Sequence, residues 1–504
     1  MNKKIQEQSI LKSGFYTMSM GVLGKAFGFI STLLTAYYFG ANTKTDIIFF
    51  ACLIIFTLST LFSAYNSNIL LPQLLKSTPS EKTILINYSF TRLTGYLLIS
   101  FGLIYSFHLD FFSIFSKFKI DQLQEAHLSI VLLLPILILQ PLNDLMINIA
   151  QSFKNYSLSN LSSLLVGICN VSCLLFLSSI LQENSLALGF LCASISQFFL
   201  FYLYLYKKQL HPKLSLKQPH NNRAISSLLF PTVLLQLVSS ILLILPDFFA
   251  SSLNEGTLSL MSYGKRVFDL IPTLFIYPIV LVFYPRICEW INQKNLSLLK
   301  AKLLLLIQLL FLFISPCAFF LMAYSSDIIS LLFFKAKLNQ SQLSIASNCL
   351  CLMALSTPAF IVSSISGRLI AASQTKNTFY LQLLIQGMGS LLLAILITML
   401  IDIHHYLAIL YALLIYHLIY SQLSNLVLIN SQIVKFSILK FFSLEAAFCL
   451  VPVFVAYISY TIKSNPSLPY PLAMSLGFYI VCNGLLIGFF YKRNQKSIKE
   501  LLNS

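Results

Sequence analysis

The sequence predicts an all-α integral membrane protein with about fourteen transmembrane helices. Apolar residues make up 57% of the 504 positions, charged residues make up 10%, and the mean hydropathy is +0.81. Apolar runs recur from one end of the chain to the other. They are long enough to span a bilayer, because roughly 20 helical residues cross a hydrocarbon core of about 30 Å. The polar gaps between the runs are too short for a large soluble domain.

Fourteen apolar runs define the predicted helices in chain order. They cover residues 14–39, 46–75, 91–112, 127–152, 157–180, 185–206, 225–252, 262–284, 299–323, 346–371, 378–401, 405–428, 440–462 and 469–491. Turn-forming residues separate them, for example Gly40, Ala41 and Asn42 after the first run. An even number of spans places both ends of the chain on the same side of the membrane.

The placement of the 33 Lys and Arg residues supports this assignment. Twenty-four of them fall on the side of the two termini, and three lie inside predicted spans. The six on the opposite side are Lys44, Lys117, Lys119, Lys335, Lys337 and Lys463. Because cytoplasmic loops of membrane proteins are enriched in Lys and Arg, this asymmetry predicts that both termini are cytoplasmic.

Several function classes are disfavoured by what the sequence lacks. The net charge of +17 would fit nucleic-acid binding in a soluble protein, but here the basic residues lie in short gaps between spans, which indicates membrane topology instead. The ten cysteines and seven histidines have no metal-ligand spacing. The sequence has no phosphate-binding loop, no H-E-x-x-H and no G-x-S-x-G. We therefore expect no catalytic residues, metal, cofactor, nucleotide or nucleic acid.

Three cations inside predicted spans are the first candidate site. Lys25, Lys265 and Arg266 would each cost at least about 2.5–3.5 kcal/mol in the hydrocarbon core, so such residues usually face a bundle interior or a wet cavity. Lys265 and Asp269 are four residues apart and share a helix face, so we expect them to pair. Arg266 points about 100° away and is left for a ligand. The alternative is that Lys265 and Arg266 extend to the membrane interface.

Prolines and a further acid mark the two spans at the middle of the chain. Pro231 and Pro246 are predicted to interrupt the seventh span, and Pro272 and Pro278 the eighth. Proline bends membrane helices and frees backbone carbonyls. Two bent, charged helices would line a cavity, and Asp247 would be a coupling site beside a helix break. The alternative for Asp247 is an acid near the interface.

Other acids inside or beside the spans have simpler alternatives. Asp144 lies in the middle of the fourth span and is a candidate cavity residue, or else the acceptor of an interhelical hydrogen bond. Glu445, near the start of the thirteenth span, has the same alternative. Asp46 is a further cavity or coupling candidate, but an N-cap of the second span is its simplest role.

Several ordered motifs resemble the MurJ/MviN family of lipid II flippases. The segment GVLGKAFGFISTLLTAYYFGANTKTDIIFFA at 21–51 resembles the opening of that family, and SYGKRVFDLIPTLFIYPIVLVFYPRICE at 262–289 resembles its eighth span. Similar segments are SNILLPQLLK at 67–76, INIAQSFKNYSLSNLSSLLVGICN at 147–170, SSDIISLLFFKAKLNQ at 325–340 and AASQTKNTFYLQLLI at 371–385. The likeness runs along the whole chain and includes the fourteen-helix count.

The resemblance implies a MATE-like exporter fold of the MOP superfamily. Two six-helix lobes, here 14–206 and 225–428, would surround a central cavity and be joined by a cytoplasmic linker at 207–224. The extra helix pair at 440–491 would line a groove for a polyprenyl tail. The implied location is the bacterial cytoplasmic (inner) membrane.

The same resemblance implies a cargo. A polyprenyl-diphosphate-linked glycan, in the first instance lipid II, would move from the cytoplasmic to the outer leaflet by alternating access among membrane lipids. A diphosphate needs cations in the cavity, and Arg266 stands where the family has a cavity arginine. The family's other arginines are absent at Gly21, Phe27, Leu58 and Ser59, and Lys265 replaces an aspartate. Lys25 could supply the missing charge.

Rival functions follow from the same residues. A flippase for another lipid-linked oligosaccharide, of the O-antigen or exopolysaccharide type, would fit the fold equally. An ion-coupled exporter of cationic drugs should have an acidic cavity, a glycan-modifying enzyme should show a pair of acids or histidines, and a scaffold would leave Lys25 unexplained. Without a nucleotide site, transport would be driven by the membrane potential, by a monovalent cation gradient or by consumption of the product.

Overall fold

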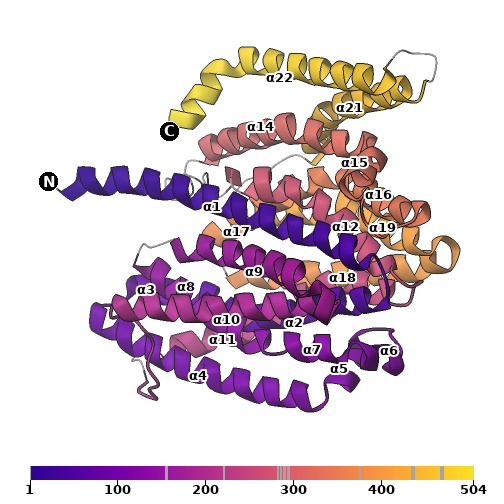
Figure 1. The fold of residues 1–504 in the computed structure, drawn as a ribbon. Helices are drawn as coiled ribbons and strands as arrows, with labels where there is room; N and C mark the ends of the chain where they lie inside the picture. Colours follow the sequence, from indigo (N-terminus) through magenta and orange to yellow (C-terminus); the bar gives the residue numbers. More distant parts are fainter. Residues whose placement is uncertain are drawn as a thin grey trace. The chain divides into compact units, whose positions relative to one another are not determined.

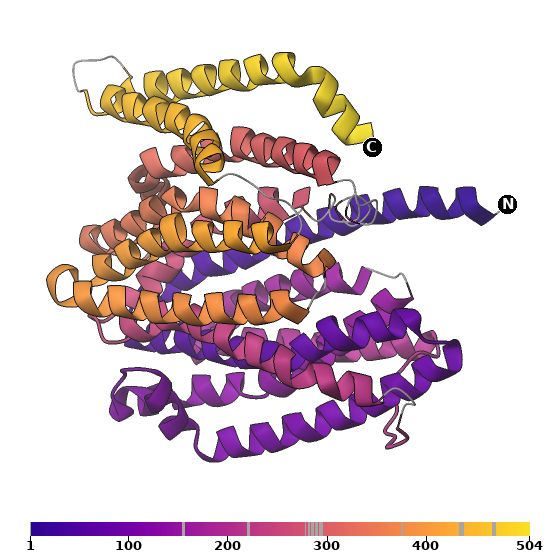
Figure 2. The same cartoon turned by 180° about the vertical axis from the view of Figure 1, so that it is seen from behind.

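The computed structural model describes residues 2–153, 157–218, 222–277, 279–280, 283, 287, 291, 296–373, 376–432, 438–465 and 470–503. Every regular element in these ranges is a helix (Figures 1 and 2), which confirms the predicted all-α class. The chain divides into two compact units: Met1–Leu260 with Lys335–Asn339, and Met261–Phe334 with Gln340–Ser504.

The first unit holds the helices up to α11 and the start of α12. Their bounds are α1 (Asn2–Phe39), α2 (Thr43–Tyr65), the π-helical turn η1 (Asn66–Leu70), α3 (Leu71–Lys76), α4 (Pro79–Ser106), α5 (His108–Phe115), α6 (Ile120–Glu125), α7 (His127–Leu133), α8 (Ile136–Ser152), α9 (Ser157–Leu181), α10 (Asn184–Lys207), α11 (Asn222–Ala250) and α12 (Thr257–Phe268).

The second unit begins within α12 and holds the remaining helices. These are η2 (Pro272–Ile276), α14 (Leu296–Ala323), α15 (Ser325–Leu332), α16 (Gln340–Leu355), α17 (Thr357–Ser373), α18 (Lys376–His404), α19 (Tyr406–Ile415), η3 (Tyr416–Ser421), α20 (Gln422–Gln432), α21 (Ile438–Lys463) and α22 (Pro471–Asn503).

Most of the predicted spans have a counterpart among the described residues. Ten helices there are long and apolar enough to cross a membrane, and two bent helix pairs raise that number to twelve. Each of the twelve overlaps a different predicted span. The two without a counterpart are 262–284, which includes residues outside the described ranges, and 440–462, represented by the shorter apolar stretch Phe448–Lys463. The total of fourteen stays a prediction.

Glycines bring α1 and α9 into close contact. A Cβ on Gly24 would lie 2.5 Å from the Ser163 hydroxyl oxygen, and one on Gly167 would lie 2.5 Å from the Cβ of Phe27. Small residues are enriched at helix contacts in membranes because they let backbones approach and gain van der Waals packing. These two glycines therefore position α1 against α9.

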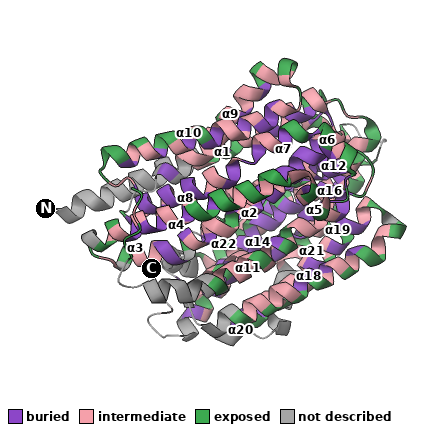
Figure 3. Cartoon of the chain, turned by 90° about the horizontal axis from the view of Figure 1, so that it is seen from below, coloured by how far each residue is buried: buried purple, intermediate pink, exposed green. Residues whose placement is uncertain are grey.

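Apolar side chains cover the outer helix faces as well as the core. Leu145, Ile149 and Phe201 are fully buried in the first unit, whereas Phe176 and Ile180 on α9 are 76% and 75% exposed. Figure 3 shows these two environments, with buried residues in purple and exposed ones in green. Large exposed apolar faces are unusual in soluble proteins and fit contact with lipid.

The C-terminal pair α21 and α22 is attached to α14 and α15 within the second unit. The Tyr479 hydroxyl on α22 donates to the Pro316 carbonyl on α14 at 2.5 Å, and the Tyr324 hydroxyl donates to the Ser475 hydroxyl oxygen at 2.9 Å. Lys463, at the end of α21, forms an ion pair with Asp327 of α15. The pair lies beside α14 in Figures 1 and 2.

Of the three predicted proline interruptions that fall on described residues, one coincides with an irregularity and two do not. Helix α11 runs without a break from Asn222 to Ala250 through Pro231 and Pro246, so the expected break beside Asp247 is wrong. Neighbouring helices and local adjustments can satisfy the carbonyls that a proline frees. Pro272 does mark an irregularity, because the π-helical turn η2 begins there. Pro278 lies outside the described residues.

The first compact unit is larger than the lobe predicted at 14–206. It also contains α11, which packs against α2 and whose Gln236 amide donates to the Thr60 hydroxyl oxygen at 3.0 Å. The compact units are defined by contacts within the structure, whereas the predicted lobes are defined by the order of the spans along the chain. The division into 14–206, 225–428 and a tail-binding pair at 440–491 therefore stays a prediction.

Candidate functional site

The first turn of α2 carries a buried carboxylate that holds the start of α12. Asp46 is 4% exposed. It accepts hydrogen bonds from the Gly256 N–H at 2.8 Å, the Ser259 N–H at 2.7 Å and the Ser259 hydroxyl at 2.5 Å. The first N–H groups of a helix have no partner within it, and negative charge is favourable there. Asp46 therefore caps α12.

The prediction that Asp46 is the N-cap of its own helix is wrong. Helix α2 begins at Thr43, three residues earlier than expected, and Asn42 is its cap. The Asn42 side-chain oxygen accepts from the Thr45 N–H at 2.9 Å, and the Thr45 hydroxyl oxygen accepts from the Asn42 N–H at 2.9 Å. This capping box leaves the Asp46 carboxylate available for α12.

The turn between α1 and α2 also binds two acids from other turns. The Asn42 amide donates to a Glu183 carboxylate oxygen at 3.1 Å, and the Thr43 N–H donates to a Glu255 carboxylate oxygen at 3.1 Å. Glu183 lies between α9 and α10, and Glu255 between α11 and α12. Sequence reasoning missed both acids, because nothing local distinguishes them from other loop residues.

Residues 335–339 contact the same turn. The Lys337 N–H donates to the Ala36 carbonyl at 3.2 Å, and a Cβ on Gly40 would lie 2.6 Å from the Lys337 carbonyl oxygen. Gly40 and Gly256 have φ of +71° and +80°, a conformation that favours glycine. The connections after the first, fifth, seventh and ninth predicted spans thus meet at one end of this unit, as alternating topology requires.

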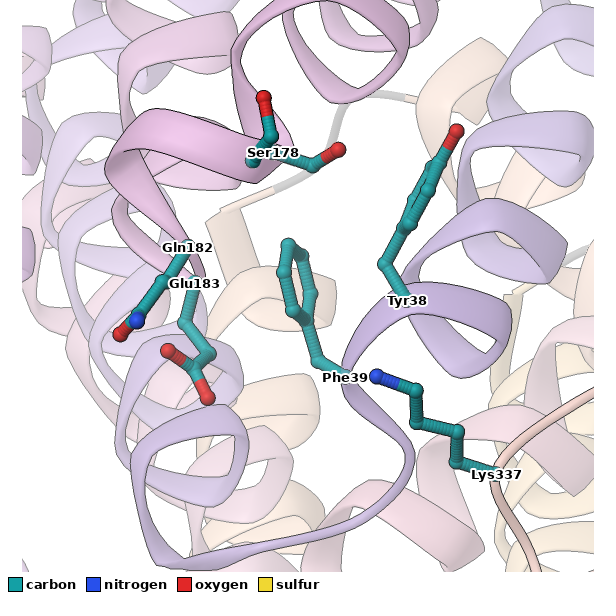
Figure 4. A pocket seen from close by; sticks show the side chains of 7 residues that line it. Tyr38, Phe39, Ser178, Gln182, Glu183 and Lys337 are labelled. Carbon is teal, nitrogen blue, oxygen red and sulfur yellow. The ribbon is translucent and has the colours of Figure 1, made fainter.

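A cavity of about 450 Å³ opens beside this turn (Figure 4). It is lined by Tyr38, Phe39, Ser178, Ser179, Gln182, Glu183 and Lys337. The lining combines two aromatic rings with hydroxyl, amide, carboxylate and ammonium groups. It is chemically mixed, and none of the predicted site residues contributes to it.

The charged stretch at the end of α12 is fixed by close packing on α16. Gly264 leaves no room for a side chain because a Cβ there would meet the Ala346 carbonyl oxygen, and the Cys349 thiol donates to the Met261 carbonyl at 3.2 Å. Next to this contact, Lys265 is exposed and Arg266 is partly buried. The expected roles of both cations stay predictions.

The helix changes form directly after these cations. Asp269 follows the last residue of α12 and is partly buried, and its carbonyl accepts the Thr273 hydroxyl at 2.5 Å. The π-helical turn η2 begins at Pro272. Such turns occur frequently at functional sites. The pairing of Lys265 with Asp269 stays a prediction.

A histidine that the sequence did not single out lies near the end of α12. His417 sits in the π-helical turn η3, its ring centroid is 5.0 Å from that of Phe360, and the Phe360 ring centroid is 5.3 Å from that of Phe268, the last residue of α12. Phe268 and His417 are about 150 residues apart in the chain, so spacing could not have connected them. His417 thus joins the polar groups around the end of α12.

Lys25 lies in the first unit, on the exposed side of α1 next to the Gly24 contact. The positions where the resemblance expects arginines hold other groups. Phe27 packs against Gly167, and Ser59 is fully buried with its hydroxyl donating to a carbonyl in its own helix at 2.8 Å. Leu58 and Gly21 are partly buried. Lys25 as a substitute charge stays a prediction.

The two remaining acids also belong to the first unit. The Ser63 hydroxyl of α2 donates to Asp144 at 2.5 Å and the Gln140 amide donates to it at 3.1 Å, which confirms the interhelical hydrogen bond considered as its alternative role. Asp247 is partly buried within the unbroken α11. The Glu445 side chain lies outside the described residues.

Comparison with known proteins places the chain in a family. The family model described as lipid II flippase MurJ matches residues 35–469. This chain belongs to the MurJ lipid II flippase family. Within that range lie α12 and six of the seven candidate site residues, and Lys25 lies before it.

Curated relatives carry the same family name. A probable lipid II flippase MurJ of Buchnera aphidicola subsp. Schizaphis graminum (strain Sg) is 27% identical over 274 residues, which cover 52% of this chain and 53% of the relative. The corresponding protein of Buchnera aphidicola subsp. Baizongia pistaciae (strain Bp) is 22% identical over 337 residues, covering 64% and 66%. The matched part thus spans about half to two thirds of these relatives' length.

Solved structures share the fold. A lipid II flippase MurJ in an inward closed conformation matches with a TM-score of 0.80 at 19% identity, covering 96% of this chain and all of the other. An inward-facing multidrug transporter of the MATE family in the MOP superfamily matches with a TM-score of 0.60 at 12% identity, covering 90% and 96%. The protein is a multi-pass membrane protein with the MurJ fold, which confirms the resemblance read from its motifs.

Proposed function

We propose that this protein moves lipid II, a polyprenyl-diphosphate-linked glycan, from the cytoplasmic to the outer leaflet of the bacterial inner membrane by alternating access. The observation that carries the proposal is the MurJ family match over 35–469, which includes the cationic end of α12. On this proposal the protein is a transporter without a catalytic residue, cofactor or nucleotide, and its partners are the glycan lipid and the surrounding membrane.

The diphosphate is bound by Arg266, with Lys25 and Lys265 as further cations. Arg266 is partly buried in the last turn of α12, and the π-helical turn η2 begins six residues later. Such turns are frequent at functional sites. A guanidinium offers a planar pair of donors to a phosphate, whereas an ammonium acts as a point charge. Arg266 therefore supplies geometry and the lysines supply charge.

Both termini lie in the cytoplasm on this proposal. The support is the bias of 24 basic residues against six between the two sides. Helices α21 and α22 bind the polyprenyl tail, because they form an additional pair beside α14 with exposed apolar residues such as Phe454 and Phe489.

The membrane potential or a monovalent cation gradient drives the cycle. Moving one charge through the field is worth about 2.3 kcal/mol per 100 mV, enough to bias two conformations. Asp247, Asp144, Asp46 and Asp269 are the candidate coupling acids. Asp46 and Asp144 accept hydrogen bonds from neighbouring helices, so a proton or cation at either acid would also change a contact between helices. Transport that responds to neither potential nor cation replacement would remove this part of the proposal.

Depletion of the protein tests the function. The expected result is that lipid II accumulates in the cytoplasmic leaflet and becomes inaccessible to a reagent added outside the cell. Unchanged accessibility of every polyprenyl-linked intermediate would exclude flipping. A selective loss of another lipid-linked oligosaccharide would keep the mechanism and replace the cargo.

A further inference from the structure

The segment between α10 and α11 combines exposed leucines with lysines. Residues 213–217 read Lys-Leu-Ser-Leu-Lys, and Lys207 and Lys208 precede them at the end of α10. Leu214 is 74% exposed and Leu216 is 78% exposed, although neither belongs to a membrane-spanning helix. Residues 207–218 contain no acid.

Hydrogen bonds hold this segment in a defined place on α4. The Lys213 N–H donates to the Asn87 side-chain oxygen at 2.8 Å, and the Ser215 N–H donates to the Thr91 hydroxyl oxygen at 2.8 Å. Asn87 and Thr91 are one helical turn apart on α4, and the segment passes across this helix in Figure 1. The two exposed leucines are therefore on an irregular segment that is anchored to α4.

The contacted turn of α4 has the length context and the composition that are typical of a membrane interface. Helix α4 has 28 residues, about 42 Å of helix, which exceeds a hydrocarbon core of about 30 Å. One turn around Thr91 carries Arg92, whose guanidinium donates to the hydroxyls of Tyr88 at 3.0 Å and Tyr96 at 2.6 Å. Tyrosines and basic residues are typical of the interface between headgroups and acyl chains.

From this placement we propose that residues 213–217 are an interfacial anchor for anionic phospholipids. Leu214 and Leu216 insert at the boundary of the acyl chains, and Lys207, Lys208, Lys213 and Lys217 bind the phosphate headgroups around them. Apolar insertion and electrostatic attraction to an anionic leaflet together make such binding composition-dependent. The proposal is independent of what the protein transports.

The test measures the depth of residue 214 in bilayers of different charge. The full chain carries one tryptophan, Trp290, so Trp290→Phe gives a background in which Leu214→Trp is the sole reporter. The protein is placed in nanodiscs of acyl-brominated phosphatidylcholine, alone or mixed with acyl-brominated phosphatidylglycerol. We expect the fluorescence of the tryptophan at residue 214 to be quenched about twofold or more strongly in the anionic mixture than in phosphatidylcholine alone.

Two further variants separate the contributions. Lys213→Gln with Lys217→Gln should remove the difference between the two lipids, and Lys213→Arg with Lys217→Arg should keep it. Gln124→Trp, at an exposed position on α6, is the control and should be quenched weakly in both lipids. An unchanged melting temperature shows that each variant is folded.

Two results would overturn the proposal. Equal strong quenching in both lipids would mean that the leucines are simply immersed in lipid without headgroup recognition. Weak quenching at residue 214 in both would mean that the segment faces water or a protein partner.

Discussion

Asp46 shows how one side chain joins two elements far apart in sequence. Its carboxylate accepts three hydrogen bonds from Gly256 and Ser259 at the start of α12. Because it is buried, replacing it leaves donors without partners, and each such donor costs about 1–3 kcal/mol.

Asp46→Ala should therefore lower the free energy of unfolding by about 2–4 kcal/mol. Asp46→Asn should cost less, because one side-chain oxygen remains as an acceptor. Thermal unfolding of the purified protein measures both changes, with Asp121→Asn, at an exposed acid on α6, as the control. Equal stability of Asp46→Ala and the parent protein would contradict the capping role.

Lys265 and Asp269 are expected to depend on each other in a way that Arg266 does not. If the two pair in the membrane, Lys265→Ala leaves an uncompensated acid, a change that costs about 3–5 kcal/mol for a buried pair and less here because Lys265 is exposed. Adding Asp269→Asn should restore part of the lost function or abundance. Complementation of a depleted strain, with membrane abundance checked by blot, measures this rescue. No rescue would mean that the two are not paired.

At these positions the sequence indicated the residue but not always its partner. Asp46 was recognisable as an acid at a helix start, yet its partners on α12 are more than 200 residues away, so the capping of a second helix could not be read from local pattern. For Asp144, the sequence predicted an interhelical hydrogen bond as one alternative, but it did not identify Ser63 of α2 as the donor. Local sequence patterns therefore do not identify contacts between residues that are far apart in the chain.

Among the elements, α1 and α9 depend on glycines at specific positions. A Cβ at residue 24 would approach backbone atoms of Ser163 and Leu164 within 2.8 Å, whereas a Cβ at Gly28 meets nothing within 4 Å. The two glycines lie one turn apart on the same helix, so they form a matched pair for a test.

Gly24→Ala should cost about 1–3 kcal/mol, because the helices must separate to accommodate the methyl group. Gly28→Ala should be neutral or slightly stabilising, since alanine is the better helix former. Melting temperatures of the two variants provide the comparison. Equal loss in both would mean that glycine is needed for another reason than the contact with α9.

Polar contacts attach the C-terminal helix pair both at its edge and in its interior. The Lys463–Asp327 ion pair is partly exposed, so Asp327→Asn should cost less than about 1 kcal/mol. Tyr479→Phe removes a buried hydrogen bond to the Pro316 carbonyl and should cost about 1 kcal/mol or more. Unfolding measured in the two variants ranks these contacts. A larger loss of unfolding free energy in Asp327→Asn than in Tyr479→Phe would mean that the ion pair stabilises the helix pair more than the buried hydrogen bond does.

The helices themselves were largely predictable, because a membrane span is a long apolar run and the run is visible in the sequence. The prolines were less informative. Pro246 was expected to break α11 but lies in an unbroken helix, while Pro272 coincides with a π-helical turn. A proline removes one donor and frees a carbonyl, and whether the helix breaks depends on neighbours that sequence does not specify.

For the molecule as a whole, the alternation of fourteen spans stays a prediction, which the first unit supports. Turns that the order of the predicted spans places on the same side meet there, as in the contacts of Asn42 with Glu183 and Thr43 with Glu255. The comparisons add the family and the fold. The cargo and its direction of movement are the central claim.

The most direct test of that claim is the outer-leaflet accessibility of lipid II in cells that depend on variants of this protein. The account predicts that Arg266→Ala, present at normal abundance, leaves lipid II inaccessible from outside, and that Arg266→Lys restores part of the accessibility because a point charge remains. Full accessibility with Arg266→Ala together with Lys25→Ala, at normal abundance, would contradict the proposed diphosphate site. Full accessibility after complete removal of the protein would contradict the function itself.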